Sequence, residues 1–387
     1  MSLEWLIVGG GIHGVHLASR LIADADVSQD RLAIVDPADR LLARWRSCTE
    51  VTGMRYLRSP ATHHVGLAPN SLQIFAGKKR LREPGYFAEP NLRPSLELFN
   101  AHCDHVVSKL GLSEIHLRDR ALACIADKRS VLVRLARRGW IESRNVIFAM
   151  GPSEQPNWPQ WAPRKHARVS HIFESDFNGW PTSASERVTV IGGGISAAQL
   201  ALRLVGEGHR VRLVTRHEFR VHQFDSDPAW LGRRLTEDFH RQRRASRRRE
   251  IITKARHRGS IPPQIIRLLK RAIHRDLVVW DREIVEEVIP SSDVVYVQFS
   301  SGLVVEADRV LLATGFAPRR PGGPLIDSLV ESASLPCAQC GYPIVDAALR
   351  WHRRIYVTGP LAELEIGPVS RNIAGARAAA DRIVSQL

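Results

Sequence analysis

Near the N-terminus the chain reads Leu6-Ile7-Val8-Gly9-Gly10-Gly11-Ile12-His13-Gly14, an apolar strand that runs directly into glycines. A helical pattern of apolar residues follows as far as Ile22. The spacing G-x-G-x-x-G between a strand and a helix is the arrangement in which backbone N–H groups at the helix start face a pyrophosphate. We expect Gly9 to permit the tight turn, Gly11 to leave room for the pyrophosphate, and Gly14 to let helix and strand pack closely.

A second apolar strand, Leu32-Ala33-Ile34-Val35, ends on an acid at the distance that a dinucleotide site requires. Asp36 lies 22 residues beyond Gly14, and its carboxylate can accept a hydrogen bond from a ribose hydroxyl. Strand, motif, helix, strand and acid together predict a dinucleotide site here. The alternative is a glycine turn that holds no ligand.

The same design recurs about 180 residues later as Val188-Thr189-Val190-Ile191-Gly192-Gly193-Gly194-Ile195-Ser196-Ala197, which reads G-x-G-x-x-A. Its glycines and its alanine give three candidate cofactor-binding residues, Gly192, Gly194 and Ala197.

The strand after this second motif ends in Thr215-Arg216-His217, without an acid. An acid there would repel a 2'-phosphate, whereas Arg216 can pair with one, so the sequence predicts NADP rather than NAD, with Thr215 and Arg216 at the nucleotide. His217 and the segment from Arg241 to Arg249 are further candidates to share that phosphate. The alternative for Arg216 is a surface charge.

Composition describes a globular chain with an unusual excess of positive charge. Its 387 residues are 44% hydrophobic and 25% charged, which suits two domains, and the formal net charge is +15 at pH 7. Such a positive charge is typical of proteins that bind nucleic acid or a membrane surface. Here it has one local source, the stretch from Arg233 to Arg249. Since that stretch has almost no aromatic residue for base stacking, we expect a solvated helix face or a phosphate-facing patch, and no nucleic-acid partner.

Cysteine usage and hydropathy favour a cytoplasmic protein without a membrane segment. The five cysteines are too few and too scattered for a secreted disulfide scaffold, and we find neither an 18-residue apolar run nor a basic leader. Cys337-Ala338-Gln339-Cys340 is a C-x-x-C pattern, which is found in redox dithiols and in zinc sites. Its place in a proline-flanked loop favours an incidental pair, and no second ligand pair follows, so we predict no metal site.

With both glycine motifs in place, the chain resembles the flavoproteins with two dinucleotide-binding domains. These include flavin-containing monooxygenases, the amine N-hydroxylases of siderophore synthesis and pyridine nucleotide-disulfide reductases. Val146-Ile147-Phe148-Ala149-Met150-Gly151 and Val310-Leu311-Leu312-Ala313-Thr314-Gly315-Phe316 are similar to that class's crossovers between domains, and the second is similar to the A-T-G-Y/F signature. Thr314 and Gly315 are therefore candidate cofactor residues.

The resemblance implies an α/β fold with two Rossmann-like domains, FAD at the first motif and NADPH at the second. The NADP domain would be inserted into a discontinuous FAD domain. We expect a first FAD-binding part over residues 1–155, an NADP-binding domain over 156–304 and a second FAD-binding part over 305–387.

Two further segments are similar to flavin-contacting parts of that class. The stretch Trp45 to Pro60 would place Trp45 and Met54 on the isoalloxazine, although both residue types are also ordinary core. The run Ile355-Tyr356-Val357-Thr358-Gly359-Pro360, with Gly367 after it, resembles the segment that closes over the flavin. Gly359 and Gly367 are therefore candidate cofactor residues.

The chain also departs from the class. Pro360 stands where an Asp commonly holds the ribityl chain, and Ser59-Pro60 stands where flavin-containing monooxygenases usually have an Asn. Only Ser170-His171-Ile172-Phe173 remains of the fingerprint F-x-G-x-x-x-H, which is closer to the N-hydroxylase branch.

The function implied by the resemblance is an NADPH-dependent FAD monooxygenase with oxygen and a small nucleophilic substrate, an amine, as its partners. NADPH would reduce the flavin, and a C4a-hydroperoxyflavin would hydroxylate the amine; no catalytic side chain is identified. Two alternatives remain: a reductase that passes electrons to a disulfide, quinone or protein acceptor, and a non-catalytic FAD/NADP-binding sensor. The sequence does not indicate the oligomeric state.

Overall fold

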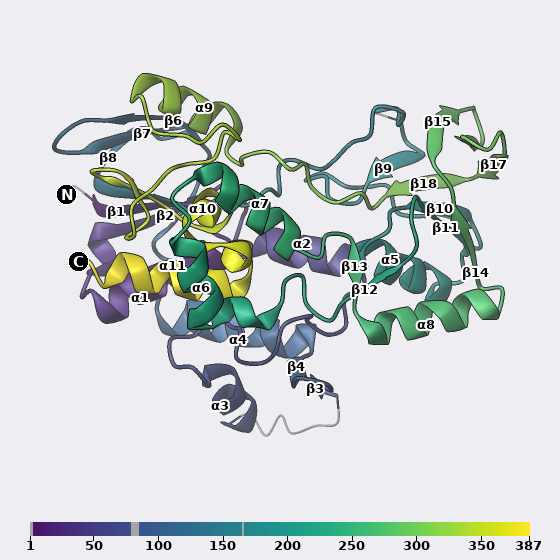
Figure 1. Ribbon diagram of the computed structural model, residues 1–387, viewed down its shortest axis with the longest axis horizontal. Helices are drawn as coiled ribbons and strands as arrows, with labels where there is room; N and C mark the ends of the chain where they lie inside the picture. Colours follow the sequence, from purple (N-terminus) through teal and green to yellow (C-terminus); the bar gives the residue numbers. More distant parts are fainter. Residues whose placement is uncertain (1–2, 79–84, 165) are drawn as a thin grey trace.

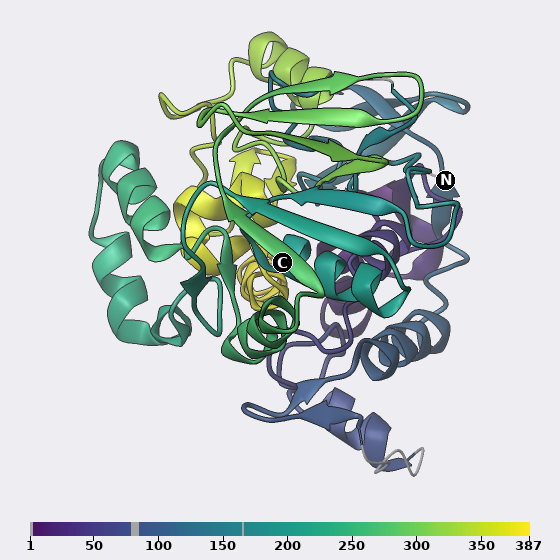
Figure 2. The ribbon, with the colours of Figure 1, turned by 90° about the vertical axis from the view of Figure 1, so that its right-hand side faces the viewer.

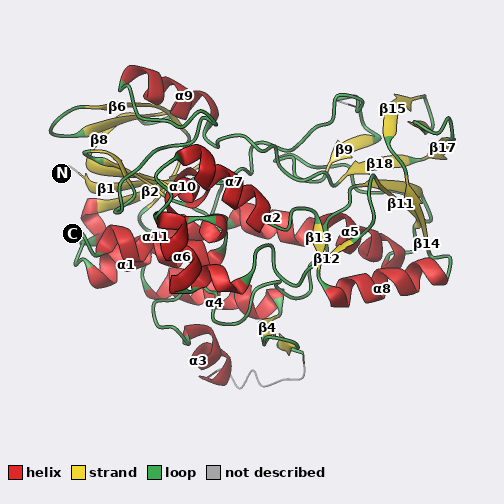
Figure 3. Ribbon diagram, in the orientation of Figure 1, coloured by secondary structure: helices red, strands yellow, loops and turns green. Residues whose placement is uncertain are grey.

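The chain folds into two α/β units that lie end to end along the longest axis of the molecule, with both termini in the first unit (Figure 1). The computed structural model describes residues 3–78, 85–164 and 166–387. Figure 3 shows most of the strands gathered in two groups, one in each unit, with helices around and between them. Within this described part, no helix is both long enough and apolar enough to cross a membrane.

The first unit is built on a largely parallel sheet with β1 near its centre. Its strands, in spatial order, are β19 (Arg350–His352), β20 (Ile355–Val357), β8 (Gly139–Phe148), β1 (Leu3–Val8), β2 (Leu32–Asp36) and β5 (His116–Arg118). Ile7 of β1 lies opposite Ile34 on one side and Ile147 on the other, and all three side chains are fully buried. Strands that are apolar on both faces are typical of a parallel sheet covered on both sides.

Helices and a β-meander cover this sheet. The helix α1 (Ile12–Asp24) packs along α11 (Ile373–Val384), so the two ends of the chain share one layer. On the far edge, β6 (Ala121–Ala126) and β7 (Val131–Leu135) form an antiparallel meander with β8, and α9 (Gly323–Ser332) packs on β6. The remaining elements are α2 (Ala43–Val51), α3 (Ser71–Lys78), β3 (Phe87–Ala88), β4 (Arg93–Pro94), α4 (Leu96–Lys109) and α10 (Glu363–Ile366).

The second unit repeats the parallel architecture. Its sheet has the order β14 (Val278–Arg282), β11 (Arg210–Thr215), β10 (Arg187–Ile191), β18 (Arg309–Leu312) and β9 (Val169–His171). The helices α5 (Ile195–Gly206) and α8 (Pro263–His274) pack together beside it. A meander of β15 (Val285–Pro290), β16 (Val295–Phe299) and β17 (Val304–Ala307) packs its buried valines against the other face.

The predicted α/β class, with a second unit inserted between two halves of the first, is confirmed. The second sheet also reaches beyond the expected boundary at residue 304, because β18 pairs in parallel with both β10 and β9. We therefore propose that the chain returns to the first unit near Gly315, where Asn157 N–H donates to the Gly315 carbonyl oxygen at 2.8 Å.

One segment of the inserted part of the sequence packs on the first unit. After β12 (Arg220–Val221), the helices α6 (Arg233–His240) and α7 (Ala245–Ala255) lie over α10 and α11, before β13 (Ser260–Ile261) returns to the second unit. In Figure 2 this helix pair stands to one side of the second sheet, next to the C-terminal helices. A small apolar cluster of Phe239, Ile252, Tyr342 and Leu364 fixes the contact.

Candidate cofactor and substrate cavity

The first glycine motif, Gly9 to Gly14, contains two glycines that the protein's own backbone requires. Gly9 has a φ of +116°, and a Cβ atom there would lie 2.7 Å from the carbonyl oxygen of Ala149. A Cβ atom at Gly14 would lie 1.9 Å from the carbonyl oxygen of Gly9, a distance that no side chain tolerates. These positions therefore match the tight turn and the close helix packing that the sequence predicts.

Gly11 is different, because no protein atom lies within 4 Å of a Cβ atom built on it. Packing within the described protein thus gives no reason for glycine at this position. Gly11 is also the N-cap of α1, and no side chain caps the free N–H groups of that helix's first turn. Open space beside uncapped helix N–H groups fits a pyrophosphate.

Asp36 lies next to the same motif, at the end of β2. Its Oδ2 accepts a hydrogen bond from Gly10 N–H at 2.7 Å, and its Oδ1 accepts one from Ala38 N–H at 3.0 Å. A carboxylate has about four acceptor positions, so two remain for a ribose. The predicted adenosine contact is compatible with this geometry, and Asp36 also orders the glycine turn.

The second motif, Gly192 to Ala197, follows the same plan in the second sheet. A Cβ atom at Gly192 would lie 2.4 Å from the carbonyl oxygen of Ala313, and Ala197 is fully buried where helix and strand meet. As in the first motif, no side chain caps the helix, whose N-cap is Gly194. A Cβ atom at Gly194 would lie 3.4 Å from Gly259, so this loop is more closely covered than the first.

Thr215 and Arg216 have different roles: Thr215 is bonded within the protein, whereas the Arg216 side chain is free to contact a ligand. Thr215 is buried, and its hydroxyl donates to the His217 carbonyl oxygen at 3.0 Å and accepts from Trp280 Nε1 at 2.9 Å. Arg216 is exposed, lines the central cavity, and forms no hydrogen bond or ion pair with any described residue. Its guanidinium is therefore available to a ligand.

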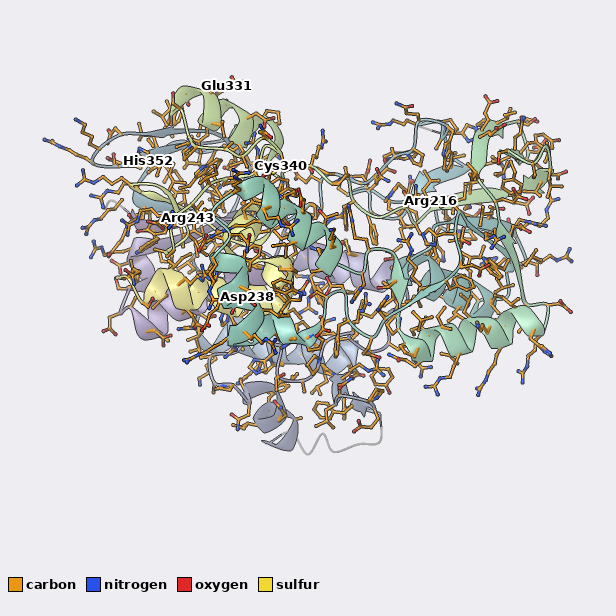
Figure 4. The ribbon with its side chains drawn as sticks, in the orientation of Figure 1. Arg216, Asp238, Arg243, Glu331, Cys340 and His352 are labelled. Atoms are coloured by element: carbon orange, nitrogen blue, oxygen red, sulfur yellow. The ribbon has the colours of Figure 1, made fainter. Side chains whose placement is uncertain are left out.

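The expectation that Arg241 to Arg249 shares the nucleotide phosphate with Arg216 is not supported. Figure 4 shows Arg243 over the first unit and Arg216 over the second, far apart along the longest axis. Arg248 and Arg249 instead form ion pairs with Glu365 and Glu363 of α10. This part of the basic segment attaches α7 to the first unit.

Both motifs open into one cavity of about 2040 Å³ between the two units. A pocket for one small ligand typically measures about 300–1,000 Å³, so this cavity has room for two dinucleotides. The predicted site residues that line it are Gly9, Gly11, Asp36, Trp45, Met54, Gly192, Gly194, Arg216, Thr314, Gly315 and Gly359. Four predicted site residues do not line it, namely Gly14, Ala197, Thr215 and Gly367.

The physical reasons for these four differ. Gly14 and Ala197 support the motifs from behind, and Thr215 is occupied by its own neighbours. Gly367, with a φ of +95°, allows the turn after α10 and lies against Phe239 of α6. It therefore serves the contact between α6 and the first unit.

Trp45 and Met54 lie on the cavity wall as well as against the core, which is compatible with the predicted contact to the isoalloxazine. Trp45 Nε1 donates to Asn100 Oδ1 at 3.1 Å, and its ring packs against Phe99 with centroids 5.3 Å apart. Trp45 is thus fixed by protein contacts while one part of it faces the cavity.

Residues just after the first crossover segment contact the end of the second: Pro156 forms a β-bridge with Phe316, and a buried histidine lies beside Thr314. Thr314 Oγ1 donates to the Asn157 carbonyl oxygen at 2.6 Å and lies 3.1 Å from His171 Nε2. Burial lowers the pKa of His171 to about 4, so the ring is neutral. Thr314 and His171 therefore hold the connection between the units, and Gly315, with a φ of +77°, provides the turn at the cavity wall.

A second neutral histidine lies inside the first motif. His13 Nδ1 lies 2.7 Å from Thr358 Oγ1, beside Gly359, and burial lowers the pKa of His13 to about 4. Sequence reasoning named His13 only as a spacer within G-x-G-x-x-G. The contact joins the start of α1 to the C-terminal segment, which a pattern of neighbouring residues cannot reveal.

Sequence reasoning also missed a group of charged residues on the cavity wall under α7. The group comprises Arg58, Asp225, Arg249, Arg256, Glu363 and Arg371. Of these residues, only Arg249 was singled out in the sequence, as part of the basic stretch. Their convergence depends on α7 folding back onto the first unit.

The two cysteines of the C-x-x-C pattern lie at different depths. Cys340, labelled in Figure 4, is exposed and lines the cavity, whereas Cys337 is partly buried and lies 3.4 Å from Arg320 Nη1. Both are free thiols. Within the described residues no group of three or more His, Cys, Asp or Glu side chains is placed to hold a metal ion.

Comparisons with known proteins agree with this geometry. Residues 6–153 match a family described as FAD-NAD(P)-binding, and residues 114–258 match the pyridine nucleotide-disulphide oxidoreductase family. An uncharacterized oxidoreductase, CzcO of Bacillus subtilis, is 26% identical over 206 residues, 53% of this chain and 52% of that protein. The chain thus spans about half the length of the curated relatives it matches.

Solved structures match over the whole chain. DfoA, the cadaverine monooxygenase of Erwinia amylovora bound to FAD, has a TM-score of 0.76 at 14% identity, covering 100% of this chain and 94% of that one. The ornithine hydroxylase PvdA of Pseudomonas aeruginosa has a TM-score of 0.76 at 17% identity, covering 100% and 98%. The chain therefore has the fold of FAD- and NAD(P)-binding oxidoreductases with two dinucleotide-binding domains.

Proposed function

We propose that the protein is an NADPH-dependent FAD monooxygenase that hydroxylates a small nucleophilic substrate, an amine. The observation that carries the proposal is the single cavity lined by both glycine motifs, through Gly11 of the first and Gly194 of the second. A hydride donor held by one motif and a flavin held by the other would then share one cavity. The shared fold with a cadaverine monooxygenase and an ornithine hydroxylase supports an amine as substrate.

The chain's own residues account for cofactor binding. The N–H groups at the start of α1, with the space beside Gly11, suit the FAD pyrophosphate, and Asp36 suits its ribose. At the second motif, Arg216 suits the 2'-phosphate of NADPH. Bound FAD would supply the redox and oxygen chemistry, so the protein contributes binding, orientation and exclusion of water.

Exclusion of water is assigned to α7 and the C-terminal segment. Ile252 of α7, Tyr342 and Pro360 all line the cavity between the units. Ile252 and Tyr342 are buried in the small cluster that fixes α7 to the first unit. This wall would limit the access of water to the reacting centre.

The test measures oxygen use and product together. FAD-loaded protein is mixed with NADPH and candidate amines under ¹⁸O₂, and oxygen uptake, hydrogen peroxide and the mass of the product are recorded. We expect an amine to stimulate oxygen uptake and to gain one ¹⁸O atom. NADPH oxidation that proceeds without oxygen uptake would refute the proposal.

A second candidate, a reductase for a disulfide, quinone or protein acceptor, is favoured by one observation. Cys340 lines the same cavity as the two motifs. The matched pyridine nucleotide-disulphide oxidoreductase family agrees with this candidate. Anaerobic oxidation of NADPH by a disulfide, lost on replacing Cys340 with Ser, or by a quinone, would support this candidate. If no condition gives turnover, the non-catalytic nucleotide-binding sensor remains.

A further inference from the structure

The charged group under α7 consists of two ion-pair groups and one further arginine on the same cavity wall, and we call it the arginine network: Arg58, Asp225, Arg249, Arg256, Glu363 and Arg371. Arg256 Nη2 lies 3.2 Å from Asp225 Oδ2, and Arg371 Nε lies 2.6 Å from Glu363 Oε2. Arg249 forms a second ion pair with Glu363. Two units contribute, because Asp225, Arg249 and Arg256 belong to the segment containing α7 and the others to the first unit.

The charges of the network do not balance. Four guanidinium groups face two carboxylates, Asp225 and Glu363, which leaves two positive charges in excess on the cavity wall. Arg58 donates only to neutral acceptors, the carbonyl oxygens of Gln223 and His222 at 2.7 and 2.8 Å and Ser260 Oγ at 2.8 Å. Burial lowers the pKa of Arg58 to about 10 and also lowers the pKa of Arg256. For Arg249 and Arg371 the effect of burial is outweighed by Glu363, and the pKa of both is raised. The incompletely compensated positive charge therefore lies at Arg58 and Arg256.

Several N–H groups of the network's arginines also lack a hydrogen-bond acceptor within the described part of the chain. Nη1 of Arg256, and Nε and Nη2 of Arg249, are buried without a hydrogen-bond partner among the described residues, although the Arg249 guanidinium also lies over the Tyr342 ring, 4.1 Å from its centroid, and beside Cys340. An unsatisfied buried donor costs about 1–3 kcal/mol, and more when it is charged. The two carboxylates are by contrast engaged, since Asp225 also accepts from Asn372 Nδ2 at 3.0 Å and Glu363 accepts from two arginines.

We propose that the arginine network binds an anionic group of the substrate, a carboxylate, with Arg256 as its principal contact and Arg249 as its second. A carboxylate matches the fork of guanidinium donors, neutralises part of the excess charge and satisfies the orphaned N–H groups. The inference rests on the proposed function, because it takes the bound ligand to be the substrate of that enzyme. It goes beyond it by predicting that a plain diamine is a poor ligand, since a diamine would add positive charge here.

The test compares ligands that differ by one carboxylate, in FAD-loaded protein without NADPH, so that no turnover is needed. The probes are cadaverine, lysine (cadaverine with one added carboxylate) and glutarate, which has carboxylates and no amine. Binding is measured by calorimetry and by the change in the oxidised flavin spectrum, at constant ionic strength. We expect lysine and glutarate to bind at least about 10-fold more tightly than cadaverine.

Substitutions test whether the arginine network causes the preference for carboxylate ligands. Arg256→Gln is expected to weaken lysine and glutarate by about 10- to 100-fold and to leave cadaverine nearly unchanged, because one charge-assisted contact is lost. Arg256→Lys keeps the charge and is expected to retain most of the binding, which guards against a mere folding defect. Arg243→Gln, on the exposed outer side of the helix pair, is the matched control and is expected to change nothing.

Three outcomes would overturn the inference: cadaverine binding as tightly as lysine to the parent protein, no binding of either carboxylate, or Arg256→Gln weakening NADP⁺ or FAD instead of the carboxylates. The last outcome would assign the network to a cofactor phosphate. Carboxylate binding by a protein that incorporates no ¹⁸O would refute the proposed function alone, so the two failures are distinguishable.

Discussion

The two glycine motifs share a plan but differ in what surrounds them. A Cβ atom at Gly11 of the first motif would meet no protein atom within 4 Å, whereas one at Gly194 of the second would lie 3.4 Å from Gly259. A Cβ atom at Gly193 would also lie 2.9 Å from the His217 ring. The first loop is open to a ligand, while the second is covered by the chain that leads to and from α6 and α7.

The residues at the end of the strand after each motif also differ in how many contacts they make within the protein. Asp36 is already hydrogen bonded to the first loop through Gly10 N–H, so it helps to build the site before a ligand arrives. Arg216 has no partner among the described residues. This contrast suggests a tightly held first cofactor and a second nucleotide that binds and leaves, as an FAD enzyme oxidising NADPH requires.

The largest expected effect comes from filling the open loop. Gly11→Val places a side chain in space that the protein does not use, so we expect the fold to be retained and most bound FAD to be lost. The measurement is the ratio of flavin to protein absorbance after purification, with circular dichroism and thermal unfolding as checks on the fold.

The matched control is Gly206→Val, at an exposed glycine of α5 that also has no atom within 4 Å. This variant is expected to bind FAD like the parent. A folded Gly11→Val protein that kept its flavin would show that the first motif does not hold the pyrophosphate.

The next effect concerns the free guanidinium of the second site. Arg216→Ala is expected to lower kcat/KM for NADPH by about 10- to 100-fold, because one or two charge-assisted hydrogen bonds to the 2'-phosphate are lost. NADH lacks that phosphate, so its kcat/KM is expected to stay the same. Arg210→Ala, at the exposed start of the same strand, serves as the control at equal salt. Equal losses for both nucleotides would instead assign Arg216 to the fold or to the pyrophosphate.

A smaller effect is expected from acid, through the neutral histidines beside the two motifs. Burial lowers the pKa of both His13 and His171 to about 4, below the ordinary value of 6.5. Between these values the unfolded chain binds protons that the folded chain does not, so stability falls as the pH drops from 6.5 towards 4.

Each histidine contributes up to about 1.4 kcal/mol per pH unit in that window. His171→Gln is therefore expected to flatten the dependence of the unfolding free energy on pH between 6 and 5 by about 1 kcal/mol. Urea unfolding at the two pH values measures it. An unchanged slope in the variant would mean that His171 is protonated in the folded protein.

The smallest effect is expected at Cys340. If the flavin transfers its electrons to oxygen and substrate, Cys340→Ser leaves NADPH-driven oxygen uptake unchanged, because the thiol takes no part. A loss of NADPH oxidation in this variant, with FAD content intact, would favour the reductase instead.

Local patterns predicted the fold well, because strand, glycine turn and helix are adjacent in the sequence. Gly9, Gly14 and Gly192 are needed for backbone contacts within a single β–turn–α unit or with the neighbouring strand, so their spacing alone indicated their role. The expected boundary at residue 304 was less accurate. β18 carries the A-T-G-F signature at its end, yet it pairs with the second sheet, and only the strand register reveals this.

The candidate site was predicted in part for the same physical reason. Residues near the motifs, such as Asp36 and Arg216, were found, whereas the arginine network was not, because Arg58, Arg256 and Glu363 come from three distant segments. Their meeting depends on α7 crossing to the first unit, which is fixed by tertiary packing around Phe239 and Ile252. The arginine-rich composition of α6 and α7 indicated charge, but not which side chains face the cavity.

The central claim is that two different dinucleotides, held by the two motifs, meet in one cavity. The most direct measurement is anaerobic rapid mixing of the FAD-loaded protein with NADPH or with NADH, followed by the flavin absorbance. We predict complete bleaching by NADPH, with a second-order rate constant at least about 10-fold higher than that for NADH. Failure of saturating NADPH to reduce the flavin, or a preference for NADH, would contradict the account.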